Sequence, residues 1–448
     1  MEFKEIIDNF QSTQNFAWMT FGEDYYNSDN TEIMSRKKQY YADGRLYQEH
    51  PYKANHKLPS GYLKKIVDQK VQYLLGNGIT ITDEDERSEE IFKEIFIDEL
   101  DELVSDVGTT ASKKIVGWVQ AHIQDGIIKF TEIPPEQIIA FKDGFGNIVK
   151  LIRFFNTFDE NFKEVLRVEV WDSETVTVHI ETADGFRKEE PQAHMVIQSI
   201  STTGELMAEE AHSFGRVPFI PMFNNKANTS DLKAIKPFID IYDIVNSDFA
   251  NNIDDMQDAF YIIKNYGGEN LAEFMEQLKQ LKAVPVGDDG DVKTEQLKIP
   301  VEARKTFLDL TDMNIFKFGM GVDTTDLTGS SITNVVIKAM FADLDLKADQ
   351  FEVQVTQFLN NITWFINWWL DNLRNQPMIT PKFTYNRSLI VNEVELLKAN
   401  AEQKGSISED TRLSNHVWVK NVEDEKELIE EENEMMLNSL DNNMGFNE

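Results

Sequence analysis

GMGVDTTDLTGSSITNVVIKAMF, residues 319–341, is small and polar in its first half and helical in pattern in its second half. Long helical patterns lie on both sides of this stretch. A surface connection between two packed helices needs only a few residues and no such run of Gly, Ser, Thr and Asp. The stretch therefore predicts a loop with its own task, placed between a helix at 301–318 and a helix of about forty residues that follows.

The composition predicts a globular chain with more than one folding unit. The 448 residues are 41% hydrophobic and 11% aromatic, which is enough for a substantial core. The absence of cysteine excludes disulfides, thiolate metal sites and cysteine nucleophiles. MEFKEIIDNFQ at the start lacks the pattern of a signal peptide, and the most apolar window, NITWFINWWL, is too short to span a bilayer. We expect a protein made in the cytoplasm with no membrane segment.

The formal net charge of −34 argues against a sequence-specific DNA-binding protein. Affinity for DNA depends on Lys and Arg side chains that neutralise phosphates, and a strongly acidic surface repels them. A protein that must not adhere to DNA would have such a charge. Many ordinary acidic proteins have it too.

The pattern along the chain predicts helices, then strands, then helices again. Residues 1–50 are polar and helical, and the next helix has Ser60 as its N-cap and ends at the GNG of residues 76–78. One further helix is predicted near 91–107. Short alternating runs from 118 to 223, separated by KDGFGN, DSE and ADG, predict antiparallel strands. A late strand within 378–395 and short helices around Gly405 complete the pattern.

Residues 230–260 predict a helix with two unlike faces. Apolar residues recur at steps of three and four along one face: Phe238, Tyr242, Val245, Phe249, Ile253, Met256 and Phe260. The opposite face, about 200° round the helix, is acidic and polar: Asp240, Asp243, Ser247, Asn251, Asp254 and Asp258. No cation interrupts this acidic stripe. It is either an ordinary solvated face or a surface that keeps anions away.

The sequence contains no recognisable catalytic or metal-binding motif. Its seven histidines are scattered, and the hydrolase, nucleotide-binding and kinase signatures are absent. The DDGD of residues 288–291 lacks the spacing of a calcium loop and is better interpreted as a turn. We predict that the chain is not an enzyme and needs no metal or cofactor.

The order of these segments resembles the portal proteins of tailed bacteriophages that infect Gram-positive hosts. The resemblance lies in NHKLPSGYLKKIVDQKVQYLLGNGI, IPPEQIIAFKD, RVPFIPMFNN, the two-faced helix, the small module after it, and the late FTYNRSLIVNEVE and KGSISEDTRLSNHVWVKNVEDEKE. It spans residues 55–430 and rests on segment order and phrase-length matches, with no catalytic signature.

The resemblance implies a mixed α+β fold, a portal-type subunit assembled as a cyclic ring. It has an α/β wing, a helical stem, a small α/β clip, a long channel-associated helix and an α-helical crown. The predicted units are a wing at 1–229, stem helices at 230–260 and 301–318, a clip at 261–300, a tunnel loop at 319–332, a long helix and strand returning to the wing at 333–391, a crown at 392–436, and a frayed acidic tail at 437–448.

The resemblance also implies a function and its partners. The ring, of twelve subunits in the virion and twelve or thirteen in isolation, would sit at one capsid vertex and conduct double-stranded DNA during packaging and ejection. Its partners would be further copies of itself, the major capsid and scaffolding proteins, the large terminase subunit and a head-completion protein. No membrane is implied. The protein would occur in the virion, and in the host cytoplasm during assembly.

Within this scheme the opening stretch becomes a tunnel loop that faces the DNA. Gly319, Gly321 and Gly329 would supply backbone freedom, and the absence of Lys and Arg between 322 and 334 would prevent a tight grip on phosphates. The loop residues are Val322, Asp323, Thr324, Thr325, Asp326, Leu327, Thr328, Gly329, Ser330 and Ser331.

Three further features acquire roles in this scheme. Lys338 is the candidate phosphate contact, with an ion pair to the next subunit as its alternative. The acidic stem face of Asp240, Asp243, Asp254 and Asp258 would keep the duplex central. The apolar stripe from Phe238 to Met256 would pack between subunits.

Two other classes of function compete with the portal hypothesis. One is an acidic, non-enzymatic scaffold or binding module without a DNA channel, in which the loop is a plain linker. The other is a hydrolase with an unrecognised site, which the lack of a base–nucleophile pair disfavours. The helix–module–helix insertion and the uninterrupted acidic stripe favour the portal.

Overall fold

The structure is a computed structural model. It describes residues 3–42, 44–47, 54–83, 87–97, 99–200, 206–255, 260–264, 291–295, 300–327, 333–388, 393–403, 405–414 and part of 416–430. Met256, Asp258, residues 328–331 of the predicted tunnel loop, most of 261–300 and the tail 437–448 lie outside the described residues.

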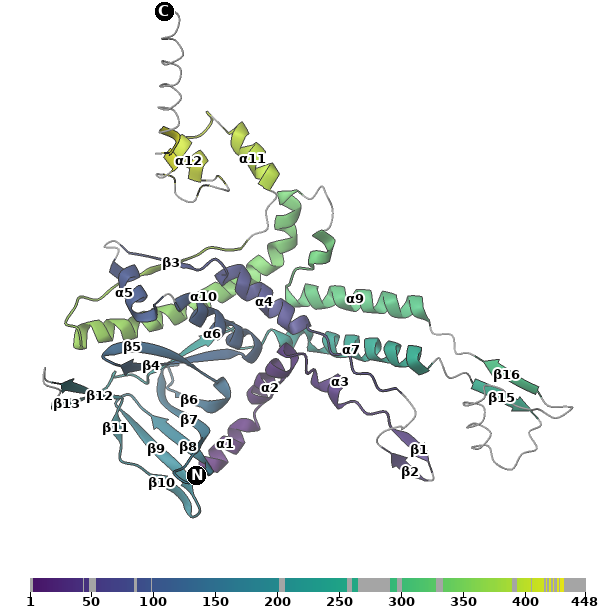
Figure 1. Ribbon diagram of the computed structural model, residues 1–448, viewed down its shortest axis with the longest axis horizontal. Coiled ribbons are helices and arrows are strands. Elements are labelled where there is room, and N and C mark those ends of the chain that lie inside the picture. The colour runs from purple at the N-terminus through teal and green to yellow at the C-terminus, as the bar shows by residue number, and fades with distance from the viewer. Residues whose placement is uncertain are drawn as a thin grey trace, which may run out of the picture.

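The N-terminal region is helical as far as Ser35, as predicted, but the helical prediction is wrong for residues 40–42 and 45–47, which form a small hairpin. Its elements are α1 (Phe3–Gln11), α2 (Gln14–Tyr26), α3 (Thr31–Ser35), β1 (Tyr40–Ala42) and β2 (Arg45–Tyr47). β1 and β2 pair with each other in antiparallel register. In Figure 1 this hairpin stands apart from the rest of the chain, beyond α3.

Helix α4 (Tyr62–Leu75) ends at Gly76, as the GNG motif predicts, and β3 (Ile79–Thr82) follows. Its predicted start is wrong, because Gly61 is the N-cap and no side chain caps the helix. The single helix predicted near 91–107 is two helices, α5 (Arg87–Phe96) and α6 (Leu100–Lys114). The chain breaks between them at Ile97, which has a positive φ of 50°.

The antiparallel β-region predicted for 118–223 is confirmed. Its strands are β4 (Val116–Gln124), β5 (Ile127–Ile133), β6 (Ile138–Lys142), β7 (Ile148–Phe158), β8 (Glu164–Trp171), β9 (Thr175–Thr182), β10 (Gly185–Lys188), β11 (Gln192–Ala193), β12 (Met195–Ile200), β13 (Leu206–His212) and β14 (Phe219–Phe223), with the short 3-10 helix η1 (Pro135–Gln137) before β6. They form a sheet β14-β4-β5, a sheet β10-β9-β8-β7-β6 with β11 beside β9, and a β12–β13 hairpin.

Two helices form a projecting antiparallel pair, which we call the stem hairpin. They are α7 (Leu232–Asp255) and α9 (Val301–Gly319), and they pack along each other. Beyond their far ends lies the strand pair β15 (Phe260–Lys264) and β16 (Asp291–Glu295). Figure 1 shows the stem hairpin extending sideways from the body with this strand pair at its tip.

After the stem hairpin, the short 3-10 helix η2 (Thr324–Leu327) precedes the long helix α10 (Asn334–Asn372). The 39 residues of α10 confirm the prediction of one very long helix. In Figure 1, α10 runs steeply at its start and then turns across the body. β17 (Lys382–Tyr385) returns to pair with β3, and α11 (Glu393–Glu402) and α12 (Glu409–Ser414) flank the predicted turn at Gly405.

The main core lies where α4, α6 and α10 meet the β14-β4-β5 sheet. Ile66, Val107, Phe358 and Trp369 are buried there, and the Trp369 indole Nε1 donates a hydrogen bond to the Gly126 carbonyl at 3.0 Å. A second core, which includes Trp118 and Trp171, lies between the two larger sheets. The stem hairpin therefore projects from a large, well-packed base.

Candidate functional site

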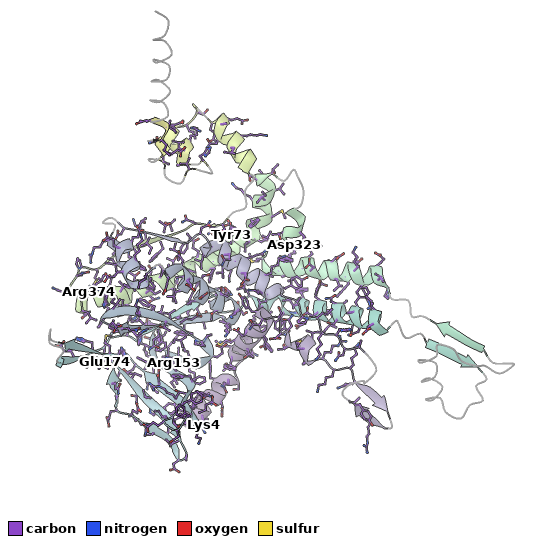
Figure 2. The ribbon with its side chains drawn as sticks, in the orientation of Figure 1. Lys4, Tyr73, Arg153, Glu174, Asp323 and Arg374 are labelled. Carbon is purple, nitrogen blue, oxygen red and sulfur yellow. The ribbon has the colours of Figure 1, made fainter. Side chains whose placement is uncertain are left out.

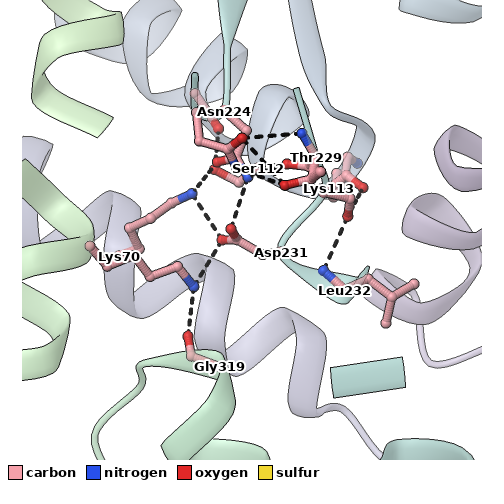
Figure 3. A network of polar contacts seen from close by, with 12 residues as sticks. Lys70, Ser112, Lys113, Asn224, Thr229, Asp231, Leu232 and Gly319 are labelled. Atoms are coloured by element: carbon pink, nitrogen blue, oxygen red, sulfur yellow. Dashed lines mark hydrogen bonds and ion pairs between the residues drawn. The ribbon is translucent and has the colours of Figure 1, made fainter. Parts of the chain in front are cut away.

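A buried ion cluster joins α4, α7 and α10 at the base of the stem hairpin (Figure 3). The carboxylate oxygen Oδ2 of Asp231, just before α7, lies 2.9 Å from Lys70 Nζ and 3.1 Å from Lys347 Nζ. Burial by itself would raise the pKa of Asp231, but the two ammonium groups outweigh it and hold that pKa well below its usual range. Burial lowers the pKa of Lys70 to about 8, against the opposing effect of Asp231. The cluster is a charged anchor inside the fold.

The same cluster reaches the end of α9. Lys347 Nζ donates a hydrogen bond to the Gly319 carbonyl at 2.8 Å, and Asn224 connects Lys70 with Asp231. Beside it lies a cavity of about 270 Å³, bordered by Asn224, Lys347 and the end of α9. The beginning of one stem helix, the end of the other and the long helix are thus tied together at one point.

The first residues of the predicted tunnel loop are held firmly against α4. The Gln69 side chain bonds both backbone groups of Val322, accepting from its N–H at 3.1 Å and donating to its carbonyl at 2.7 Å. A Cβ at Gly319 would come within 2.6 Å of Ile66 Cδ1, so the glycine permits close packing. The prediction that Gly319 and Gly321 supply backbone freedom is wrong, because both lie against α4.

Val322 itself does not face outward. Only 3% of it is exposed, and it packs with Tyr73, Ile337 and Phe341. Its predicted contact with DNA is therefore wrong within this fold. In Figure 2, Tyr73 and Asp323 lie at this junction, beside the base of α9.

The next residues of the loop are accessible. Thr324 and Thr325 are exposed, and the Asp323 carboxylate accepts a hydrogen bond from the Thr325 N–H at 3.0 Å. For Asp326 and Leu327 the structure describes the backbone, as part of η2. Thr328, Gly329, Ser330 and Ser331 lie outside the described residues. The DNA-facing role of this part stays a prediction.

The polar face of α7 is covered by the N-terminal region. Asp243 is fully buried; it accepts hydrogen bonds from the Asn30 side chain and from the Ser60 N–H, the latter at 3.0 Å. Burial raises the pKa of Asp243 above its usual range despite these bonds. Asp240 accepts hydrogen bonds from Tyr25 and Lys236.

Farther along the same face, the Ser247 hydroxyl accepts a hydrogen bond from the Leu58 N–H at 3.0 Å, and the Asn251 side-chain oxygen Oδ1 accepts one from the His56 N–H at 2.6 Å. Asp254 is exposed and pairs with His56 at 3.1 Å. The prediction of an open, cation-free acidic face is therefore wrong for Asp240 and Asp243. This face binds residues 25–30 and 56–60 of its own chain.

The predicted subunit-packing stripe of α7 is also largely used inside the chain. Phe238 stacks on Phe318 with ring centroids 5.2 Å apart, and Tyr242 meets Tyr62 edge to face at 5.1 Å. Arg304 of α9 lies over the Phe249 ring. Val245 is half-buried, whereas Ile253 is 52% exposed and remains available to a neighbour.

Lys338 lies in the second turn of α10 and is exposed. Within the described part of the chain it makes no ion pair, which leaves both of its predicted roles open. The described residues contain no group of three or more His, Asp or Glu side chains placed to hold a metal ion. Among them, no helix combines the length and the apolar run that a membrane span requires.

Sequence reasoning missed the ion cluster and the Gln69 clamp. A signal for the cluster was present, because Lys70 falls on the helical face of Leu63, Ile66, Val67 and Leu74, and such a lone cation on an apolar face needs a buried partner. Lys347 likewise falls on the same helical face of α10 as the apolar residues Leu344 and Phe351. No local pattern indicates Asp231 as their shared partner.

Comparison with known proteins gives consistent matches over nearly the whole chain. Residues 10–438 match the family described as phage portal protein, SPP1 Gp6-like. The portal protein of Bacillus phage SPP1 is 29% identical over 444 residues, which cover 95% of this chain and 86% of that protein. The portal protein of Clostridium phage phiCD119 is 24% identical over 443 residues, covering 91% of this chain and 94% of that protein.

Proposed function

Because the chain belongs to the SPP1 Gp6-like family of phage portal proteins, we propose that it forms the ring through which double-stranded DNA enters and leaves a phage capsid. The ring contains about twelve copies around a central channel. Head-to-tail contacts between identical subunits generate such a ring when the rotation from one copy to the next closes. The protein acts as a structural conduit without catalysis, metal or cofactor. It belongs to the virion at one capsid vertex, and to the host cytoplasm during assembly.

The observation that carries this proposal is the stem hairpin with its anchored base. α7 and α9 project together, and the Asp231 cluster fixes the beginning of one and the end of the other to α4 and α10. A pair of helices held at one end by buried charges suits a wall that must keep its shape while a duplex moves past it.

The part of the loop proposed to face DNA begins at Asp323. Its exposed members Thr324 and Thr325 offer hydroxyl groups, and residues 323–334 contain no Lys or Arg. Non-specific affinity for DNA grows with each neutralised phosphate, so a cation-free loop suits rapid passage. Thr328 to Ser331 extend the same chemistry in the sequence. Lys338 in α10 is the proposed phosphate contact, and Lys65 of α4 lies 3.9 Å from the Asp323 carboxylate at the start of the loop.

The remaining partners follow from the same proposal. The tip of the stem hairpin around β15 and β16 docks the large terminase subunit during packaging and a head-completion protein afterwards. The body contacts the major capsid and scaffolding proteins. Residues 393–414, with α11 and α12, belong to the proposed crown.

The experiment that tests the function is the mass and shape of the purified native particle. Native mass spectrometry should give twelve or thirteen times the subunit mass of 51.7 kDa, and class-averaged electron micrographs should show a ring with an open centre. A monomer or dimer that stays unassembled at high concentration, alone and with capsid scaffold, would instead favour an acidic binding module without a channel.

A further inference from the structure

Residues 36–47 form a projecting segment that we call the arm. Its β1–β2 hairpin turns at Gly44, which has a φ of +71°, and Leu46 on β2 is 56% exposed. Arg45 and Tyr47 beside it are exposed as well. A two-stranded hairpin is marginally stable in water unless another surface covers it. The arm therefore exposes the apolar side chain of Leu46, and a surface that covered it would stabilise the hairpin.

The root of the arm is fixed to α7. Arg36 lies 3.0 Å and Lys38 3.8 Å from the carboxylate of Asp248. Lys37 and Arg45 are exposed. Residues 36–47 contain four cations and one carboxylate, a net +3 in a chain whose net charge is −34. The arm is a basic, partly apolar surface held in a defined place.

The second surface is the outer face of α9. Ile315 is fully buried toward the body, whereas Leu310 is 50% and Met313 60% exposed. These two residues lie five and two positions before Ile315, which at about 100° per residue places them on the opposite side of the helix. Glu302 and Asp309 are exposed beside this apolar face, and Lys317 is exposed on it, four residues after Met313. The outer face of α9 is thus apolar, with the carboxylates Glu302 and Asp309 at its rim and one cation among its exposed residues.

The two surfaces lie on opposite sides of the stem hairpin. In Figure 1, α9, α7 and the arm lie one below another in that order, and α7 contacts both α9 and α3. Two complementary patches on opposite sides of one subunit generate a head-to-tail contact, which closes into a ring. A pair of patches on the same side would favour a closed dimer.

We propose that the arm of one copy docks on the outer α9 face of the next copy in the ring. The inference rests on the proposed function and adds the surfaces that join neighbours. Leu46 packs near Leu310 and Met313, and Lys37 and Arg45 approach the rim of Glu302 and Asp309. A second copy is the favoured occupant because the basic arm meets a subunit of strongly opposite net charge.

The test is site-directed crosslinking, for which a chain without cysteine is well suited. The full-length variant carrying both Leu46→Cys and Leu310→Cys is assembled and treated with a short bis-maleimide reagent. We expect a ladder of covalent multimers up to the complete ring. Either single-cysteine variant alone should give no ladder. Phe145→Cys paired with Leu310→Cys is the matched control, since Phe145 is 94% exposed in the turn between β6 and β7.

A second variant tests whether the contact contributes to assembly. Leu46→Asp should raise the subunit concentration needed for half-assembly by about tenfold, as loss of an interface anchor does, whereas Phe145→Asp should not. Intact rings that give no more crosslinking than the Phe145 control would overturn the arm contact and leave the portal function standing. Absence of any ring in the unmodified protein would overturn both.

Discussion

At the scale of single residues, the most informative group is Asp231 with its two lysines. Removing two ammonium groups and a carboxylate from water is costly, and only close pairing compensates for that cost. Lys70 is 1% exposed in its side chain, and Asp231 is 6% exposed. Close pairing offsets this desolvation cost only when α4, α7 and α10 bring the three charged groups together. The cluster therefore favours one arrangement of the stem base.

Asp231→Asn should destabilise the subunit by about 3–5 kcal/mol, because it leaves two buried ammonium groups without a counter-charge. Thermal or denaturant unfolding measures the change. Lys70→Met should cost less, since Asp231 keeps Lys347 at 3.1 Å. Asp184→Asn in the exposed β9–β10 turn is the matched control. Equal stability of the Asp231 and Asp184 variants would show that the cluster is not an anchor.

The same variant should change the response to acid. The pKa of Asp231 is held below its usual range in the fold, so its stabilisation is present above about pH 4 and is lost as the pH falls further. The Asp231→Asn variant lacks this titrating carboxyl group. Its stability should therefore fall less steeply in acid than that of the unmodified chain.

At the scale of elements, α7 shows how an amphipathic pattern can have more than one meaning. Its polar face resembles a solvated stripe in sequence, yet Ser247 and Asn251 accept hydrogen bonds from the backbone of residues 56–58. Its apolar face meets α9 of the same chain at Phe238, while Ile253 on that face stays exposed. Both faces of α7 therefore make contacts within the chain. One packs on the helix α9, and the other packs on the extended segment of residues 56–58.

The loop after α9 belongs to the same scale. Replacing Thr324, Thr325 and Thr328 with lysine should leave ring mass unchanged and slow DNA packaging severalfold, because each added cation grips a passing phosphate. A packaging assay with purified terminase measures the rate. The triple Thr→Asn variant keeps the charge and should package normally. An unchanged rate in the lysine variant would place the loop away from the DNA.

At the scale of the whole molecule, charge is the dominant property. A net −34 on each subunit produces a field that disfavours contact with nucleic acid over most of the surface. Assembly must bring such subunits together, which requires local apolar or oppositely charged contacts. The arm and the outer face of α9 are surfaces of that kind.

The assembled ring should therefore not retain linear double-stranded DNA at physiological salt. A gel-shift or filter-binding measurement over a range of salt concentrations tests this expectation. The lysine loop variant should show measurable, salt-sensitive retention, which makes it the positive comparison. Strong retention by the unmodified ring, falling steeply with salt, would mean that an outer basic surface binds phosphates.

Much of the secondary structure was predictable from the sequence because it depends on local patterns. The period of apolar residues identified α9 and the 39-residue α10, alternation and turn residues identified the antiparallel strands, and GNG marked the end of α4. The break at Ile97 was not predictable, since a β-branched residue rarely adopts a positive φ and none of the usual turn residues marks this position.

The sequence by itself determined most of the helical and strand segments, the overall charge and, through its resemblance, the portal family. Only the tertiary structure decided which faces are covered: Asp243 is buried under the N-terminal region, Val322 lies in a core, and Leu310 and Met313 remain exposed. The physical reason is that periodicity records where a side chain points on its own element. Its partner is chosen by long-range packing, which brings together residues as far apart as Lys70, Asp231 and Lys347.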